Sequence, residues 1–247
     1  MPNVLFLLAH NDDEYFASLR IREELHLGNR VFIAYLTYGG RPDEDPGVRV
    51  KESLGVLGKS GIREADLLMI GRRKDIRDLR LHEKTVDAYQ DLAGLLGDIP
   101  IERIYVMAWE GGHPDHDASH LIGMAFACRR NLREQVYEFP AYSRFRVMHP
   151  PCDASELLIA GTSRMDAFRT LVSGFSYRSQ RRTFLAMLPG SIVQLLLLGY
   201  QNYWLVPHDR DYAKPPHAGR LFYERRYHIS FATFSKNVAC IYQYLRG

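Results

Sequence analysis

Two short stretches of the chain concentrate side chains that bind metal ions and transfer protons. Residues 10–14 read HNDDE, and residues 113–117 read HPDHD. Three adjacent carboxylates repel one another, so a fold that gathers Asp12, Asp13 and Glu14 needs a positive charge to offset the repulsion. A divalent cation supplies such a charge, and imidazole with carboxylate is a ligand set that suits zinc. The two stretches therefore predict a metal site.

The alternative is that the three acids only cap a helix. Carboxylates are favoured at a helix N-terminus, where they face the positive end of the helix dipole. This interpretation accounts for one or two of the acids. It does not account for His10, nor for the second cluster of histidines and aspartates.

The elements on either side predict where the two stretches lie. Each follows an expected strand, residues 4–9 in the first case and 101–109 in the second. The first of these is an unbroken apolar run, which is typical of a strand buried on both faces, as in a parallel sheet. Open α/β sheets bind ligands at the carboxyl ends of such strands. We therefore expect both stretches to meet in one cleft.

The order of expected elements predicts an α/β fold of Rossmann-like type, with a mostly parallel sheet and helices on both faces. We expect one domain over residues 1–247, with a core at 1–141 and an extension at 142–247 that shapes the substrate pocket. In the core, residues 41–47 and 71–80 are expected to be loops. The expected strands are 4–9, 31–36, 66–70, 101–109 and 135–139, and the expected helices are 14–27, 48–57, 81–96 and 118–130.

The extension is harder to interpret. Helices are expected at 163–172 and 182–198, the second broken at Pro189-Gly190, and one or two strands at 220–244. The apolar segment 192–198 is shorter than the about 20 residues that span a bilayer, so we expect a core helix and no transmembrane segment; a membrane-facing surface is the alternative. Seven aromatic residues could line a pocket or belong to the core: Tyr142, Phe145, Phe175, Tyr177, Tyr200, Tyr203 and Trp204.

Composition narrows the class of protein. The chain is 46% hydrophobic and 25% charged with a net charge of +3, which is typical of a soluble globular protein and gives no case for nucleic acid. Cys128, Cys152 and Cys240 are too few and too far apart for a disulfide framework. No signal peptide is recognisable, and we expect a cytoplasmic protein. No Gly-x-Gly-x-x-Gly follows any expected strand, which argues against a dinucleotide site.

The spacing within the two stretches predicts hydrolytic chemistry. His10 and Asp13 lie three apart across a strand-to-helix turn, and either His113 or His116 can complete a set of three ligands. Three protein ligands leave the fourth position of a zinc ion for water, whose pKa the ion lowers towards about 7. A carboxylate off the metal can accept the proton of water, and a second imidazole can stabilise an oxyanion or protonate a leaving group.

These motifs are similar to those of a known family. HNDDE at residues 10–14 resembles the His-Pro-Asp-Asp-Glu signature of the PIG-L/LmbE-like zinc-dependent N-deacetylases, and HPDH at 113–116 resembles their second signature. Leu36-Thr37 with Gly39 or Gly40, and Arg49-x-x-Glu52 after them, resemble the loop and the substrate-side helix of the family. Weaker matches follow to about residue 180. Asn11 departs from the proline of the family signature, and no tyrosine lies beside Gly111-Gly112, where members often carry one.

The resemblance implies a role for each matching residue. Asp12 would be the general base, His113 would stabilise the tetrahedral intermediate or protonate the amine, and Asp115 would orient a histidine. Arg49 would hold hydroxyl or phosphate groups of the substrate. The zinc ligands would be His10, Asp13 and His116.

We therefore expect an enzyme that uses zinc, or another divalent metal, to hydrolyse the N-acetyl amide of an N-acetylglucosamine-type substrate. This small-molecule amino sugar could be a glycoside or linked to a lipid. One alternative is a hydrolase of another amide, such as a thiol conjugate or an acylated secondary metabolite. Another is a non-catalytic, metal-binding Rossmann-like module.

Overall fold

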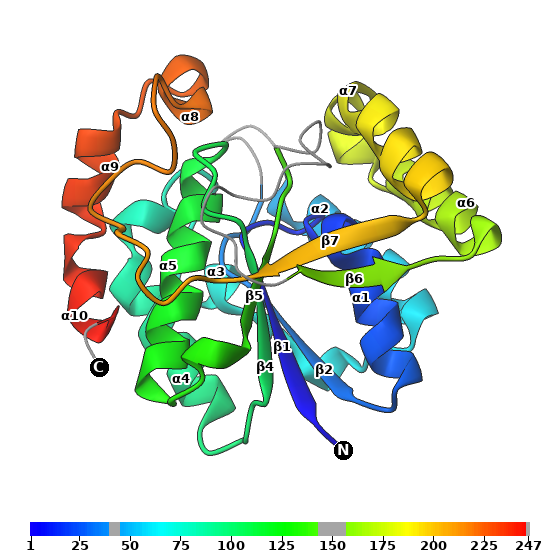
Figure 1. Ribbon diagram of the computed structural model, residues 1–247, viewed down its shortest axis with the longest axis horizontal. Coiled ribbons are helices and arrows are strands. Elements are labelled where there is room, and N and C mark those ends of the chain that lie inside the picture. The colour runs from blue at the N-terminus through cyan, green and yellow to red at the C-terminus, as the bar shows by residue number, and fades with distance from the viewer. Residues whose placement is uncertain (40–44, 143–156, 246–247) are drawn as a thin grey trace.

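A computed structural model of the protein describes residues 1–39, 45–142 and 157–245. Its centre is a seven-stranded sheet with the strand order β3-β2-β1-β4-β5-β7-β6 (Figure 1). The first five strands are parallel, and β7 and β6 are antiparallel to their neighbours. The strands are β1 (Asn3–Leu8), β2 (Arg30–Tyr35), β3 (Leu67–Met69), β4 (Arg103–Met107), β5 (Val136–Phe139), β6 (Leu157–Gly161) and β7 (Tyr200–Leu205). The expectation of a mostly parallel α/β sheet is confirmed.

The chain reverses direction across the sheet between β1 and β4. From β1 it builds outward through β2 to β3, and it then returns to the other side of β1 to form β4. Val4 of β1 lies opposite Val31 of β2 and Arg103 of β4, so these strands run side by side in register. Such a reversal point opens a crevice at the carboxyl ends of the two strands. Residues 10–14 and 113–117 both lie beyond those ends.

Helices cover both faces of the sheet (Figure 1). Leu5 and Leu7 of β1 belong to a core with α4 and α5, while Phe6 and Leu8 belong to a core with α1 and α7. This alternation follows from the two-residue repeat of a strand. The helices are α1 (Glu14–His26), α2 (Pro46–Leu57), α3 (Ile70–Arg73), α4 (Thr85–Leu96), α5 (Pro114–Arg129), α6 (Arg164–Ser173), α7 (Arg181–Ile192), α8 (Phe222–Arg226), α9 (Phe231–Asn237) and α10 (Tyr242–Leu245).

The second half of the chain differs from the sequence expectation. The strands expected at 220–244 are wrong, because this region forms α8, α9 and α10. Phe234 and Ile241 are spaced seven apart and pack into the core with α4 and α5, a helical period that the aromatic content concealed. The strands are instead β6 and β7, which the sequence analysis did not predict. They join the same sheet as the first half of the chain.

The break that was expected in this helix at Pro189-Gly190 is also wrong. Helix α7 runs through Pro189 to Ile192 and continues as a π-helical segment, Val193–Leu198. Proline removes one backbone hydrogen bond, and the wider turns of a π-helix accommodate such an irregularity without ending the helix. The expectation that residues 192–198 form a core helix is wrong too, because only Gln194 and Leu195 of the π-helical segment are buried.

Smaller differences complete the comparison. The loop expected at 71–80 begins within helix α3, and α5 begins at Pro114 rather than Ala118. Cys128 and Cys240 are free thiols. Gly40, Phe145, Cys152 and most of the loop at 41–47 lie outside the described residues.

Candidate metal centre

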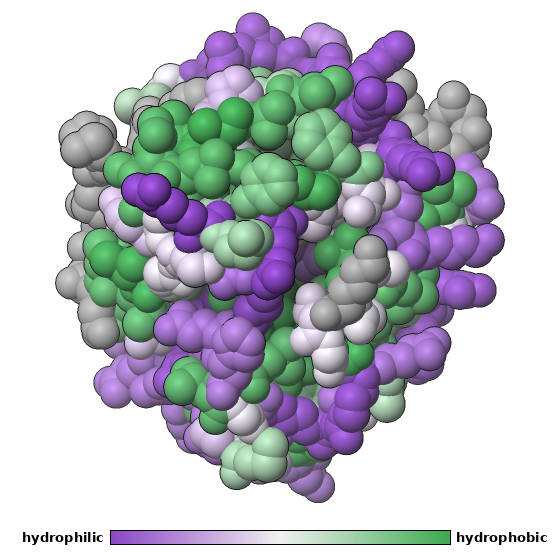
Figure 2. All heavy atoms as spheres, turned by 90° about the vertical axis from the view of Figure 1, so that its right-hand side faces the viewer, coloured by the Kyte–Doolittle hydropathy of each residue, from purple (hydrophilic) through white to green (hydrophobic). Residues whose placement is uncertain are grey.

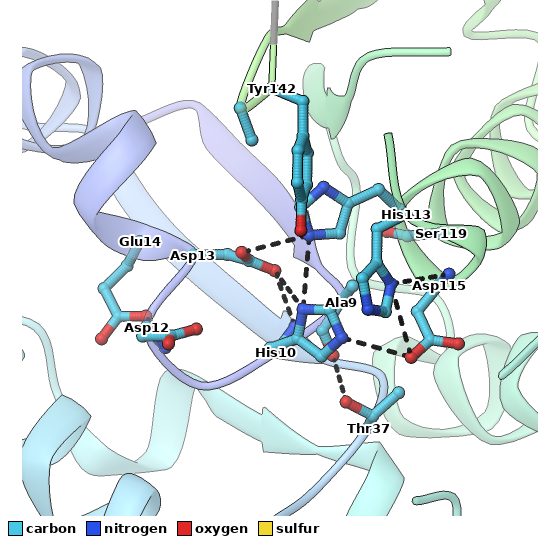
Figure 3. A network of polar contacts seen from close by, with 12 residues as sticks. Ala9, His10, Asp12, Asp13, Glu14, Thr37, His113, Asp115, Ser119 and Tyr142 are labelled. Carbon is cyan, nitrogen blue, oxygen red and sulfur yellow. Dashed lines mark hydrogen bonds and ion pairs between the residues drawn. The ribbon is translucent and has the colours of Figure 1, made fainter. Parts of the chain in front are cut away.

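The loop after β1 is folded so that its polar side chains point in different directions (Figure 3). The backbone N–H of His10 donates to Asp13 Oδ2 at 2.7 Å, which closes the turn. Asp12 has a φ of 124°, a value that non-glycine residues adopt rarely and chiefly at functional sites. Its backbone N–H donates to Glu14 Oε2 at 2.9 Å, and Tyr177 donates to Glu14 Oε1 at 2.7 Å. Glu14 therefore holds the strained turn.

Asn11 occupies the position of the family proline. It is buried, and neither polar atom of its side-chain amide has a hydrogen-bond partner among the described residues. Burial of an unpaired amide destabilises a fold. The substitution therefore adds no polar contact that the described chain can satisfy.

The loop after β4 is held by its glycines and by Asp117. Gly111 has a φ of +68°, and a Cβ on Gly112 would lie 2.5 Å from the ring of Tyr142. Asp117 Oδ1 accepts the backbone N–H groups of Glu110 and Gly111. The two glycines thus let the chain turn sharply and approach an aromatic ring closely.

His113 begins helix α5 as its N-cap. Its Nδ1 accepts the backbone N–H of Asp115 at 3.2 Å, and Pro114 occupies the first helical position. The imidazole takes the place that a serine or aspartate usually fills. Because Nδ1 accepts a hydrogen bond, the ring proton of the neutral form resides on Nε2.

Donor groups of three residues from the two loops converge (Figure 3). His10 Nδ1 lies 3.3 Å from Asp13 Oδ2 and 3.3 Å from His116 Nε2. His116 Nε2 lies 3.3 Å from Asp13 Oδ1. All three residues are buried. The ligand pair predicted in the first stretch is thus joined by one histidine of the second.

This spacing fits a metal ion. A tetrahedral zinc with bonds of about 2.0–2.1 Å places its ligand atoms about 3.3–3.4 Å apart. The side chain of Asp13 is 4% exposed and that of His116 is 3% exposed, so water reaches neither freely. Two imidazole nitrogens and a carboxylate at this distance can direct their lone pairs at one cation. The cluster can therefore hold a divalent metal.

A second group of possible ligands shares His10 with the first: His10, His113 and Asp115. Both oxygens of Asp115, however, already accept hydrogen bonds from the backbone. Its Oδ2 accepts the backbone N–H of Leu79 at 2.6 Å, and its Oδ1 accepts that of Leu81 at 3.1 Å. Asp115 Oδ2 also lies 3.2 Å from His10 Nε2. This contact places a proton on Nε2 and leaves Nδ1 of His10 free to face Asp13 and His116.

Several carboxylates surround His10 and shift its pKa. Burial lowers the pKa of His10, but the surrounding carboxylates, foremost Asp78, raise it well above its ordinary value. Burial raises the pKa of Asp13, but His116 and His10 hold it well below the usual range. The protein thus favours a positive charge at this point, as a cation site requires.

Asp12 lies in a different environment from Asp13. Its carboxylate makes no hydrogen bond or ion pair with any residue in the described ranges. Burial raises its pKa well above the ordinary value, and Asp13 adds to the rise, while Arg49 opposes it. A raised pKa makes a carboxylate a stronger base.

The two loops form the floor of a cleft of about 670 Å³. His10, Asp12, Asp13, His113 and His116 all line it. Its walls come from helix α2, the segment 78–79, the start of α7 and the residues after α8. The structure therefore brings every predicted ligand, the predicted base and His113 to one hollow.

Arg49 also lines the cleft, where it pairs with Asp78 at 2.9 Å. Glu52 instead accepts hydrogen bonds from the backbone and hydroxyl of Ser179. Asp78 was missed by the sequence analysis. It accepts the hydroxyl of Thr37 at 2.9 Å and so joins the loop after β2 to Arg49. A lone aspartate in a charged loop carries no sequence signal for this role.

Tyr142 was considered only as one of seven aromatic residues and was not assigned to the site. Its ring lies beside those of His113 and His116, and Figure 3 shows its hydroxyl pointing towards the ligand cluster. Glu110 Oε1 accepts the backbone N–H groups of Ala141 and Tyr142, each at 2.9 Å, and so fixes the residue. The signal was available only from Gly112, whose lack of a side chain makes room for the ring.

The other aromatic residues divide between core and surface. Tyr177, Tyr203 and Trp204 are buried, whereas Phe175 is 48% exposed. None of these lines the cleft in the described structure. The hypothesis of an aromatic pocket therefore holds for Tyr142 alone among the described members of that group.

Comparison with known proteins gives three findings. The sequence model of the GlcNAc-PI de-N-acetylase (PIG-L) family matches residues 5–127. No curated protein sequence matches the chain significantly. Several solved structures share the fold at low sequence identity.

Three of these structures are deacetylases. A deacetylase–bog complex from the biosynthesis pathway of teicoplanin has a TM-score of 0.62 at 14% identity, covering 82% of this chain and 96% of its own. The zinc-inhibited form of teicoplanin deacetylase Orf2 has a TM-score of 0.61 at 15% identity, with coverages of 82% and 97%. The pseudoaglycone deacetylase Dbv21 has a TM-score of 0.59 at 13% identity, with coverages of 82% and 95%.

Proposed function

Residues 5–127 of this chain are a PIG-L family domain, and from that premise we propose that the protein is a metal-dependent hydrolase of N-acetyl amides. The substrate we propose is an amino sugar of the N-acetylglucosamine type, and the products are acetate and a free amine. The metal we propose is zinc, with another divalent cation as the alternative.

One observation carries the proposal. On the floor of the cleft, His10 Nδ1 and His116 Nε2 lie 3.3 Å apart, and each of these nitrogens lies 3.3 Å from one oxygen of Asp13. The carboxylate of Asp12 lies in the same cleft outside that cluster. A structural metal site usually has four protein ligands and no spare base. A three-ligand cluster beside an unengaged carboxylate is typical of a hydrolytic centre.

His10, Asp13 and His116 would hold the metal. A bound divalent cation supplies Lewis acidity, which polarises the amide carbonyl and acidifies water. Asp12 accepts the proton that the attacking water loses, because its raised pKa makes it a stronger base than an exposed aspartate.

His113 stabilises the oxyanion that develops on the carbonyl oxygen. Its Nδ1 accepts from the Asp115 amide, so Nε2 carries the proton that can be donated into the cleft. A hydrogen-bond donor fixed in advance is worth more than one that must reorient. This arrangement favours oxyanion stabilisation over protonation of the amine by His113, and the protonated Asp12 can then return its proton to the leaving nitrogen.

Arg49 and Asp115 act by positioning. Arg49 is held by Asp78 at the cleft wall, where its guanidinium can bind hydroxyl or phosphate oxygens of the sugar. Asp115 fixes the ring of His10 through its 3.2 Å contact with Nε2. Tyr142 is positioned to contact the acyl group, because its hydroxyl points towards the cluster.

A second substrate class has specific support. Of the deacetylases with this fold, one belongs to the biosynthesis pathway of teicoplanin and another is a deacetylase of the pseudoaglycone of an antimicrobial reagent. A cleft of about 670 Å³ is within the range of pockets for drug-sized ligands and is larger than one sugar ring needs. An acylated secondary metabolite with an N-acyl amino sugar is therefore the alternative substrate.

The experiment is an assay of amine release. The purified protein is incubated with N-acetylglucosamine, simple N-acetylglucosaminides and an N-acyl aglycone glycoside, and the free amine is quantified. We expect release from at least one of them, and release lowered by at least about 100-fold in the Asp12→Asn variant. A protein with full metal occupancy that releases no amine from any of them would contradict the proposed substrate class.

A further inference from the structure

Helices α6 and α7, together with the π-helical segment Val193–Leu198 that continues α7, present several of their apolar side chains to solvent. We define the α6–α7 face by six of them, which are Phe168, Val172, Leu185, Val193, Leu196 and Leu197. Leu197 is 73% exposed and Phe168 is 58% exposed. Figure 2 views the molecule from this side and shows an extended hydrophobic area with hydrophilic residues around it. Exposed areas of this kind mark interaction sites.

The face is not simply the outside of a core helix. Phe184 and Leu195 lie on the same stretch, are buried, and pack against the sheet through the core that contains β1. The stretch Arg178–Leu198 is long and apolar enough, by length and composition, to cross a membrane, but only 28% of its most apolar window is buried. A helix that is apolar on both its inner and outer sides needs a second apolar environment.

Basic residues lie around the face. Residues 157–198 contain five arginines and one acidic residue, Asp166. Asp166 pairs with Arg169 at 3.3 Å. Three arginines are exposed and form no ion pair with any carboxylate of the described residues: Arg178, just before α7, and Arg181 and Arg182, at its start. Apolar residues beside unpaired arginines are the composition of helices that lie in a membrane interface.

We propose that the α6–α7 face docks on the surface of a membrane that contains anionic lipids. The apolar side chains enter the boundary between headgroups and acyl chains, and the arginines contact lipid phosphates. The chain lies on the bilayer and does not span it, because Phe184 and Leu195 anchor the helix to the protein core. This inference goes beyond the proposed function and does not depend on it.

Docking would determine how the mouth of the cleft is oriented relative to the membrane. Leu185 of the face and Arg181 and Arg182 beside it also line the cleft that holds the candidate metal centre. With the face on a membrane, the mouth of the cleft lies next to the headgroups. An amphiphilic substrate could then enter from the bilayer surface without passing through bulk water.

The test is co-sedimentation of the full chain with vesicles of phosphatidylcholine alone and of phosphatidylcholine mixed with phosphatidylglycerol. We expect binding to the mixed vesicles and weaker binding to the neutral ones. Arg164→Gln, on α6 and outside the cleft, should weaken binding to the mixed vesicles by about fivefold, the effect of one basic residue near an anionic surface. Absence of binding to both kinds of vesicle would overturn the proposal.

Two variants locate the surface. Leu197→Glu should abolish binding, whereas Leu27→Glu, which charges an exposed leucine after α1, should leave it unchanged. Leu197→Trp provides a readout that does not depend on loss of binding. The fluorescence of the new tryptophan should shift to the blue when the protein binds mixed vesicles. Equal binding by Leu197→Glu and wild type, or no shift for the tryptophan, would place the membrane contact elsewhere and overturn the assignment.

A second copy of the chain is the competing occupant of this face. Analytical ultracentrifugation without lipid should show a monomer. A dimer that Leu197→Glu dissociates, in a protein that does not sediment with vesicles, would make the face a subunit interface and contradict the membrane proposal.

Discussion

The cleft floor and the α6–α7 face depart from ordinary burial in opposite directions. The floor buries polar groups: His10, Asp13, His113, Asp115 and His116 are all at most 7% exposed. The face exposes apolar groups, with Leu197 at 73%. Buried polar clusters and exposed apolar areas are the two informative exceptions to the rule that apolar residues lie inside. The comparison teaches that buried polar groups point to a reactive or ligand-binding site, whereas exposed apolar groups point to a surface that contacts another body.

Energetically the two regions are not equivalent. Each buried charge on the floor depends on a partner, and an unpaired buried polar group is strongly destabilising. The leucines of the face lose little by being in water and gain only when a partner covers them. Substitutions should therefore have large effects on the floor and small effects on folding at the face.

The largest effect is expected from His116→Ala. It removes a nitrogen that lies 3.3 Å from both His10 Nδ1 and Asp13 Oδ1, so bound metal and turnover should be lost together. Metal analysis and amine release measure both. His120→Ala is the matched control, because His120 is buried one turn further along α5 but bonds to Met107 and Tyr212. Retention of metal by His116→Ala would remove this histidine from the ligand set.

Asp12→Asn should lower turnover by about 10²–10⁴-fold, the usual contribution of a general base. The metal should stay bound, because Asp12 lies outside the cluster. Asp75→Asn is the matched control, since Asp75 also has a positive φ but its side chain is 82% exposed. Full turnover by Asp12→Asn would show that another group accepts the proton.

Asp115→Asn should reduce metal affinity by about 10–100-fold, the effect of losing a group that orients a ligand. The amide keeps one acceptor oxygen for the backbone of residues 79–81 but cannot accept from all three donors. Competition with a chelator of known affinity measures the change. Complete loss of metal, equal to that of His116→Ala, would instead favour the alternative group of His10, His113 and Asp115.

Asp66→Asn should lower the free energy of unfolding by about 1 kcal/mol at neutral pH and should not affect catalysis. Burial raises the pKa of Asp66, but hydrogen bonds from Arg63 and Arg30 outweigh it and lower this pKa. A lowered folded-state pKa gives stability that is present above the unfolded value of about 3.9 and is lost as the pH falls through the folded value. Urea unfolding should therefore separate wild type and variant at pH 7 and bring them together in acid, with turnover unchanged.

The smallest effect on folding is expected at the face. Leu197→Glu should change the free energy of unfolding by less than about 0.5 kcal/mol, as exposed substitutions usually do. Leu195→Ala, two residues away and buried, should cost about 2–5 kcal/mol. Chemical denaturation measures both. A large loss of stability in Leu197→Glu would show that the side chain packs in the native fold.

Much of the fold core could be predicted because its signals are local. The apolar runs that become β1 and β4 end at polar stretches, and parallel strands bring those stretches to one edge. The convergence of His10, Asp13 and His116 follows from that topology. Their roles, and those of Asp12 and His113, stay predictions until the variants are measured.

The rest depended on long-range packing that no local pattern records. Asp78 pairs with Arg49 from a loop that carries no motif. Tyr142 packs beside His113 from the residues that follow the carboxyl end of β5. Strand β7 contains buried Gln201 and Asn202, which conceal its strand character. The exposure of residues 192–198 could not be predicted, because an apolar helix has the same composition whether it packs inside or lies on the surface.

The most direct test of the central claim is the dependence of turnover on metal content. The protein is stripped with a chelator, metal is returned in steps, and amine release from an N-acetylated amino sugar is measured at each step. We predict no release from the stripped protein and a rise that saturates at one zinc, or one other divalent ion, per chain. Undiminished release from protein shown to contain no metal would contradict the account.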